Sequence, residues 1–143
     1  MEIGATAQGT AIGTGYANTL AIIGQSDGGN TADKAGTISR AYRGPNTLTD
    51  WFLPSLNELN QMCKWQAGNT GVVLTTVTWL CGGGTINTGL GAAGFVDGEN
   101  VYWSSSEFFD QDSFVALFQY FGTGDQAYAL KEETLYVRPV RAF

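Results

Sequence analysis

Apolar and polar positions follow two different periods along this chain. Apolar residues recur at roughly helical spacing in residues 17–25 and again in residues 31–42, with glycine and asparagine nearby as boundaries. From residue 101 onward, short apolar stretches rich in aromatic and β-branched residues alternate with turn residues. The pattern therefore predicts two short helices in the first third of the chain and strands in the last third.

The clearest local signal lies before the middle of the chain. Residues 50–55 form an apolar, strand-like burst that is stopped by Pro54. Ser55 is followed three positions later by Glu58, which is the spacing of a capping box at the start of a helix. Apolar residues then recur every three or four positions and predict an amphipathic helix to about Trp65 that packs on a sheet. These residues are Leu56, Leu59 and Met62 or Cys63.

The remaining segments complete an α+β pattern. Residues 66–100 are rich in Gly, Thr and Asn, as is typical of loops, although the β-branched run 72–80 favours a strand. Further strands are predicted over residues 101–105, 113–121, 126–131 and 135–143, with a turn at 122–125. We therefore expect one α+β domain, residues 1–143, that ends in an antiparallel sheet.

Composition limits the partners. The chain has 143 residues, 43% of them hydrophobic, which is enough for the core of one domain. Its formal net charge of −6 repels phosphate backbones, so we expect no nucleic-acid partner. Residues 1–15 lack the features of a secretory signal, and no run of about 18 apolar residues is present, so we expect no membrane insertion.

The residue types needed for catalysis are sparse. The chain has no histidine, which removes Ser-His-Asp and Cys-His nucleophilic arrangements and every histidine-ligated metal site. The acidic pair Glu132/Glu133 has the character of a solvated loop. Two glycine-rich stretches, residues 9–15 and 82–84, lack the Lys-Ser/Thr of a phosphate-binding loop. We therefore expect no enzyme and no cofactor.

Metal binding and disulfide formation rest on few residues. Asp97, Glu99 and Asn100 lack the spacing of a calcium-binding EF-hand and favour a polar turn, so we expect no metal site. Cys63 and Cys81 permit one disulfide, while two buried thiols remain the alternative.

Aromatic and acidic residues interleave near the C-terminus, a combination typical of recognition surfaces. In an extended strand Phe118 and Tyr120 share one face while Leu117, Gln119 and Phe121 share the other, so both faces are largely apolar. One face belongs to the core. The other is either covered as well or exposed as an interface, and both alternatives stay open.

Three motifs point to a known family: residues 50–55 (DWFLPS) followed by Glu58 and Leu59, residues 102–107 (YWSSSE), and residues 137–143 (VRPVRAF). Together with residues 15–19 (GYANT), they resemble the C-type-lectin-fold variable proteins of diversity-generating retroelements. They are also similar to the C-terminal domain of bacterial collagen-like adhesins. The resemblance covers most of the chain, with residues 66–93 as an enlarged insertion. It implies a C-type lectin fold: short helices packed on small antiparallel sheets with long glycine-rich loops.

The resemblance also implies a variable surface. In that family, adenine-specific mutagenesis diversifies positions between the WSSSE-like segment and a fixed terminal strand. Randomising the adenines of an AAY codon never yields Trp, Met, Gln, Glu or Lys, so Gln111, Gln119, Gln126 and Lys131 are expected to be fixed. The expected ligand-binding positions all carry permitted residues. They are Phe108, Phe109, Asp110, Asp112, Phe114, Phe118, Tyr120, Thr123, Asp125, Tyr128 and Leu130.

Other positions are expected to form the scaffold that holds the variable residues. These are Trp103, Ser104, Ser105, Phe121, Gly124, Arg138 and Arg141. The chain departs from the family at Leu117, where tryptophan is frequent, and this residue is either core or itself diversified. No calcium-sugar motif is present, so the resemblance implies the lectin fold alone and not sugar binding.

The sequence thus predicts a ligand-binding display domain for a protein or other surface ligand, presented on a virion or cell surface, with oligomerisation possible. The alternative is a fixed structural or adhesin-type domain whose aromatic residues form core or a constant interface. Under this alternative, truncation of Phe118 or Tyr120 to alanine is expected to cost several kcal/mol of stability, whereas under the display function it is expected to cost little.

Overall fold

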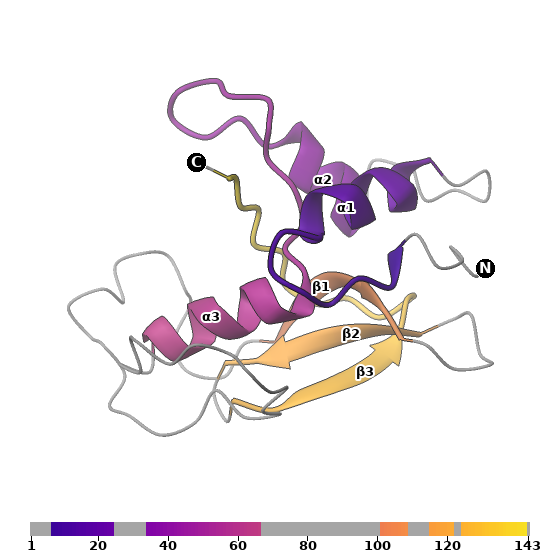
Figure 1. Ribbon diagram of the computed structural model, residues 1–143. Helices are drawn as coiled ribbons and strands as arrows, with labels where there is room; N and C mark the ends of the chain where they lie inside the picture. Colours follow the sequence, from indigo (N-terminus) through magenta and orange to yellow (C-terminus); the bar gives the residue numbers. More distant parts are fainter. Residues whose placement is uncertain (1–6, 25–33, 67–100, 109–114, 122–123, 143) are drawn as a thin grey trace.

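The computed structural model describes residues 7–24, 34–66, 101–108, 115–121 and 124–142. Within these ranges the chain forms a small α+β fold of short helices and a three-stranded antiparallel sheet (Figure 1). The elements in chain order are α1 (Gly15–Ile23), α2 (Ala35–Ala41), α3 (Leu56–Gln66), β1 (Val101–Glu107), β2 (Val115–Tyr120) and β3 (Gln126–Leu130).

Helix α3 begins as predicted from the capping box. The Ser55 backbone N–H donates to Glu58 Oε2 at 2.7 Å, and the Glu58 N–H donates to Ser55 Oγ at 3.3 Å. These reciprocal bonds satisfy backbone donors that the first turn of a helix leaves free. The helix runs to Gln66, one residue past the predicted end.

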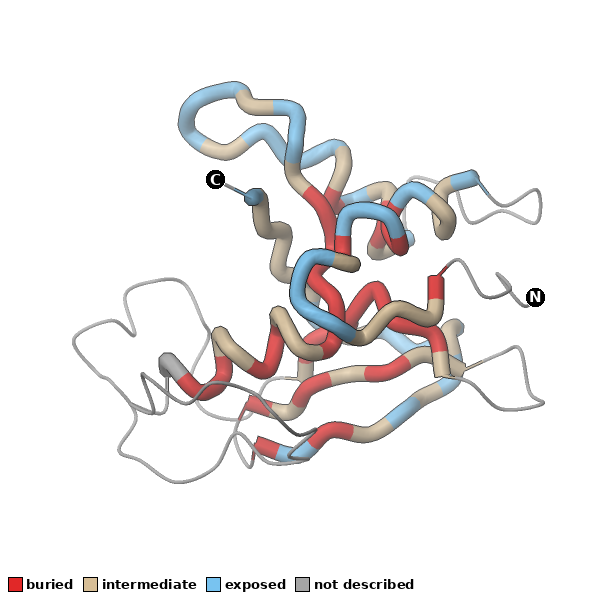
Figure 2. Tube along the Cα trace, in the orientation of Figure 1, coloured by how far each residue is buried: buried red, intermediate tan, exposed pale blue. Residues whose placement is uncertain are grey.

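The apolar face of α3 covers the sheet and forms the core, also as predicted. Leu59 and Cys63 lie in a buried cluster with Tyr102 and Phe121, against which Met62 packs. Figure 2 shows buried positions along α3 and along the strands that it packs against. Cys63 is disulfide-bonded, which decides between the two alternatives for the cysteines; Cys81 lies outside the described residues.

The strands pair in the order β1-β2-β3, so β2 is central. Trp103 pairs with Phe118, and Phe118 pairs with Ala127. The β1–β2 register shifts between Trp103 and Glu107, where Ser104 Oγ donates to the Leu117 carbonyl at 2.7 Å. A shift of this kind bends a strand. The predicted antiparallel sheet at the end of the chain is confirmed for these three strands.

Helices α1 and α2 pack against each other and confirm the two predicted short helices. Helix α1 begins two residues before the predicted segment, at Gly15. A Cβ atom at Gly15 would lie 2.8 Å from the Ser55 backbone nitrogen. Glycine therefore allows α1 to approach the start of α3 closely.

The predicted strand at 135–143 is wrong in its described part, and the strand-like segment 50–55 is not a strand either. Neither 50–55 nor 135–142 forms a strand; isolated bridges join Phe52 to Val140 and Tyr102 to Tyr136. Proline has no N–H to donate, so Pro54 and Pro139 limit continuous pairing on either side of these bridges. The C-terminal segment still connects distant parts, because Tyr136 bonds to β1 while Val140 bonds to Phe52.

Other predictions fall outside the described residues. These are the strand over 72–80, the glycine-rich stretch 82–84 and the polar turn at Asp97, Glu99 and Asn100. Within the described part of the chain, every helix is too short or too polar to cross a membrane.

Candidate binding surface

The predicted binding residues fall partly within the described structure. Phe109, Asp110, Asp112, Phe114 and Thr123 lie outside it. The described members are Phe108, Phe118, Tyr120, Asp125, Tyr128 and Leu130. Phe118 and Tyr120 lie in β2, and Tyr128 and Leu130 lie in β3. Phe108 directly follows β1, and Asp125 directly precedes β3.

The sheet register divides the strand members of this set between two faces. Tyr128 pairs with Leu117, and directly paired residues in an antiparallel sheet project to the same side. Tyr128 and Leu130 therefore share the face of Leu117, whereas Phe118 and Tyr120 project to the opposite side. The structure thus places the predicted strand residues on both faces of the hairpin rather than on one.

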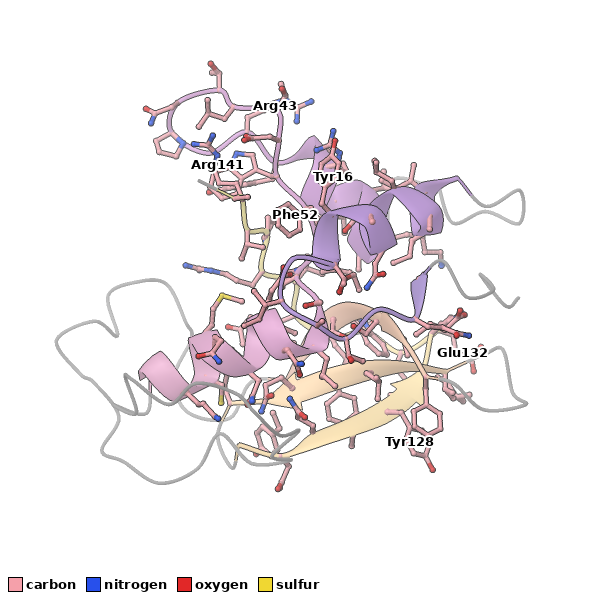
Figure 3. The ribbon with its side chains drawn as sticks, in the orientation of Figure 1. Tyr16, Arg43, Phe52, Tyr128, Glu132 and Arg141 are labelled. Carbon is pink, nitrogen blue, oxygen red and sulfur yellow. The ribbon has the colours of Figure 1, made fainter. Side chains whose placement is uncertain are left out.

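The side chains on the edge strand β3 are the most exposed of the set. Tyr128 is 57% exposed and Leu130 is 45% exposed, although both share a face with the core residue Leu117. The reason is position: α3 packs on β1 and β2, while β3 lies at the edge of the described sheet. Asp125 before β3 and Glu132 after it are also exposed. Figure 3 shows Tyr128 and Glu132 at the end of the molecule that carries the sheet.

Tyr128 is held in place by an aromatic partner. The rings of Phe108 and Tyr128 stack with centroids 4.6 Å apart and an interplanar angle of 23°. The Phe108 N–H donates to the Val115 carbonyl at 3.4 Å, which fixes the chain after β1 beside β2. In the described part of the chain, this stack brings together two aromatic rings of the predicted binding set that come from separate segments.

An ion pair lies next to this stack. Lys131 follows β3 and its Nζ pairs with Glu107 Oε1 at the end of β1. The Glu107 side chain is 2% exposed, so its charge requires a partner. The pair joins the two outer strands of the described sheet, and Lys131 is therefore a structural residue.

A second polar network holds the turn between β2 and β3. Gln119 is fully buried; its Nε2 donates to the carbonyl oxygens of Gly124 at 3.0 Å and Asp125 at 3.2 Å. The Gln126 Nε2 donates to Gln119 Oε1 at 2.9 Å. Gly124 has a φ of +82°, a backbone conformation that glycine adopts without strain. These bonds tie the backbone of Gly124 and Asp125 to β2 through buried side chains.

The opposite face of the hairpin is more covered. Phe118 is half-buried and its ring meets the buried Trp103 edge-on at a centroid distance of 6.5 Å. Tyr120 is also half-buried, and its N–H donates to the Asp125 carbonyl at 2.8 Å. Leu117 is 6% exposed and therefore belongs to the core.

Most residues predicted as scaffold are buried. Trp103, Ser104, Ser105, Phe121 and Gly124 are all buried, and the two arginines are half-buried. These arginines are Arg138 and Arg141, and Arg141 donates hydrogen bonds to both carboxylate oxygens of Asp50.

The Asp50–Arg141 contact ties the C-terminal segment to the chain before α3. Arg141 Nη2 lies 2.8 Å from Asp50 Oδ2, and Arg141 Nε lies 3.1 Å from Asp50 Oδ1. The hydrogen bonds from Arg141 lower the pKa of the Asp50 carboxyl below its ordinary value of 3.8. This pair is partly exposed to solvent and is a structural contact rather than a reactive group.

The glycine-rich loop 9–15 also has a structural role. The Gly13 N–H donates to Glu58 Oε1 at 2.8 Å, and the Gly9 carbonyl accepts bonds from Asn18 Nδ2 at 2.6 Å and Ser106 Oγ at 2.7 Å. The loop thus links α1, α3 and β1. Among the described residues, no three Cys, Asp or Glu side chains gather in an arrangement that could hold a metal ion.

Sequence reasoning missed the partners of the polar residues near the hairpin. It expected Gln119, Gln126 and Lys131 to be invariant from codon chemistry but assigned them no contacts. A signal was present, because Gln119 interrupts a strand that is otherwise apolar or aromatic. A polar side chain in such a strand must find hydrogen-bond partners when it is buried.

Comparison of this chain with protein-family models, with curated proteins and with solved structures finds no match.

Proposed function

We propose that this chain is a ligand-binding display domain with a C-type lectin fold, whose hairpin end presents a hypervariable surface. It is not an enzyme in this proposal, and it uses no cofactor. The observation that carries the proposal is a division of roles within the hairpin. Within the described residues of the hairpin, 115–121 and 124–130, the exposed side chains are of types that the codon rule permits, while the two residues of forbidden types are buried and hold the backbone.

The division is clearest around β3. Asp125, Tyr128 and Leu130 are exposed, and all three are residue types that randomised AAY codons can yield. Gln119 and Gln126 are forbidden types, and both are buried in the network that holds the turn. Exposed substitutions change stability little, whereas loss of a buried hydrogen bond costs more. A surface built in this way tolerates variation without loss of the fold.

The chemistry of the surface favours cationic or hydrogen-bonding groups on a protein ligand. The Tyr128 ring is pre-positioned by its stack on Phe108, so little side-chain entropy is lost on binding. The carboxylates of Asp125, Glu132 and Glu133 are exposed near the two ends of β3. Aromatic rings and carboxylates together attract Lys and Arg side chains through cation–π contacts and ion pairs. Display on a virion or cell surface is part of the proposal.

One observation favours the second candidate, a fixed structural or adhesin-type domain. Phe118 and Tyr120 lie on the face opposite Tyr128, and Phe118 contacts the buried Trp103. If the chain is a fixed domain, Phe118 and Tyr120 stabilise the fold. Its invariant interaction surface is then limited to the edge strand β3.

A pair of libraries tests the display function. In the first, Asp125, Tyr128 and Leu130 are varied with the codons that arise from randomised adenines in AAY. In the control library, Leu117, Gln119 and Gln126 are varied with the same codons. We expect the first library to keep most members folded and to yield binders against a lysine-rich protein such as a histone, while the control library loses folded protein. Equal loss of folded members in both libraries would contradict the proposal.

The retroelement part has a separate genetic test. The DNA near the gene is sequenced in search of a near-copy of codons 103–143 beside a reverse transcriptase. We expect the copy to differ from the gene only at adenines, and the differing codons to include those of Tyr128 and Leu130. Absence of any such copy would favour the fixed domain.

A further inference from the structure

A second group of exposed apolar side chains lies on the two N-terminal helices. Tyr16 and Leu20 are four residues apart on α1, and Ile38 and Tyr42 are four residues apart at α2 and its C-cap. All four are exposed. Residues four apart lie on one side of a helix, so each helix presents an apolar stripe to solvent.

Contacts through Arg40 and Trp51 join the two stripes. The Arg40 guanidinium lies over the Tyr16 ring, 5.2 Å from its centroid, and Arg40 Nη1 donates to the Trp51 carbonyl at 2.9 Å. The Trp51 ring in turn meets the Tyr42 ring edge-on at 4.8 Å. We call this region the α1–α2 surface and define it as Tyr16, Leu20, Ile38, Arg40, Tyr42 and Arg43.

The described residues around the α1–α2 surface carry a positive charge, although the formal net charge of the whole chain is −6. Residues 7–24 and 34–49 contain Lys34, Arg40 and Arg43 and no acidic residue. The next acid, Asp50, is paired with Arg141. Two further acids occur in residues 25–33, which lie outside the described structure.

We propose that the α1–α2 surface docks a protein segment that carries carboxylates together with apolar side chains. Connected apolar patches on a surface mark interfaces, and tyrosine and arginine are frequent at their energetic centres. Arginine pairs with carboxylates through two parallel hydrogen bonds. The overall negative charge opposes approach to nucleic acid or to an anionic membrane, whereas a short acidic segment meets mainly the local positive charge.

The location gives this docking a distinct role. Figure 3 shows Tyr16 and Arg43 at one end of the molecule and Tyr128 at the opposite end, on the sheet. A partner on the α1–α2 surface therefore leaves the hairpin end free. The docking does not rest on the display function, because it uses different residues.

The test measures binding of a glutamate–tyrosine copolymer by the change in tryptophan fluorescence. The variants are Arg43→Gln and the double variant Leu20→Ser with Arg43→Gln, since both side chains are exposed. Thr134→Glu is the matched control, because it lowers the net charge by the same amount as Arg43→Gln at an exposed position after β3. Thermal unfolding of each variant verifies that it is folded.

We expect the double variant to bind the copolymer roughly tenfold more weakly than the wild type, with Thr134→Glu unchanged. Arg43→Gln alone is expected to reduce the salt dependence of binding. Three results would overturn the docking: equal binding by the wild type and the double variant, equal binding of a lysine–tyrosine copolymer, or tighter binding of phosphatidylserine vesicles or an oligonucleotide.

Discussion

Replacement of Gln119 by methionine removes the side chain that holds the β2–β3 turn. Gln119 is fully buried, and methionine has a similar length without the amide. The substitution deletes two donated bonds, to the carbonyls of Gly124 and Asp125, and one accepted bond from Gln126. It leaves the exposed side chains of β3 untouched.

The expected cost follows from the groups that lose their partner. The Asp125 carbonyl keeps the N–H of Tyr120 at 2.8 Å, so it remains hydrogen-bonded. The Gly124 carbonyl loses the bond that Gln119 donates, and the Gln126 amide loses the Gln119 oxygen that accepts its bond. Gly124 and Gln126 are both buried. Each buried group left without a partner costs about 1–3 kcal/mol, and two groups lose theirs, so Gln119→Met is expected to lower the free energy of unfolding by about 2–6 kcal/mol.

Urea denaturation of the oxidised protein, followed by tryptophan fluorescence, measures this cost. Leu130→Thr serves as the control, because Leu130 is exposed on the same hairpin and its substitution is expected to change the free energy by less than about 0.5 kcal/mol. The double variant Gln119→Met with Gln126→Leu removes both partners of the side-chain bond. It is expected to be less destabilised than the sum of its single variants.

The reasoning is refuted if Gln119→Met changes the free energy of unfolding no more than Leu130→Thr does. If the costs of the two single variants simply add in the double variant, Gln119 and Gln126 do not interact, and the bond between their side chains does not contribute to stability.

Three further predictions concern other parts of the fold. Ser55→Ala removes the side-chain acceptor of the capping box and is expected to cost about 1 kcal/mol, measured by urea denaturation. Because Arg141 lowers the pKa of Asp50 in the folded state, the contribution of this pair is present above the ordinary carboxyl pKa and is lost as pH falls through the folded pKa. The thermal midpoints of the wild type and Asp50→Asn should therefore differ at neutral pH and converge in acid; a constant difference would contradict the pairing. Phe118→Ala is expected to destabilise the protein by about 2 kcal/mol or more because its ring contacts Trp103, whereas Tyr128→Ala should cost less, and calorimetry that ranks them in the reverse order would contradict the placement of the two faces.

The elements that could be predicted are those with local causes. The start of α3 depends on Ser55 and Glu58, which are three residues apart, so their reciprocal bonds form within one turn. The strands β2 and β3 could be located because a turn with Gly124 separates two runs of strand-forming residues. The wrongly predicted strand at 135–143 and the strand-like segment 50–55 have strand-like composition but, in the described residues, only isolated pairings. A strand requires a partner along its length, and composition does not show whether one exists.

The candidate site follows the same division. From the sequence alone, codon chemistry separated Gln119, Gln126 and Lys131 from the residues around them, but it assigned them no contacts. The contacts of Lys131 with Glu107 join residues that are far apart in the chain, so no local pattern predicts them. The α1–α2 surface was not expected either, because its tyrosines and isoleucine fit the apolar positions of ordinary amphipathic helices.

The sequence by itself determined where α3 begins, that two short helices precede it, and that antiparallel strands follow residue 101. These features depend on hydrogen bonds and side-chain periods within a few residues. Only the tertiary structure decided that Tyr128 and Leu130 are exposed while Leu117 and Gln119 on the same face are buried. The alternation of side chains along a strand shows which face of the sheet a residue occupies, but not whether another element covers that face. Here burial depends on where α3 lies across the sheet and on the edge position of β3.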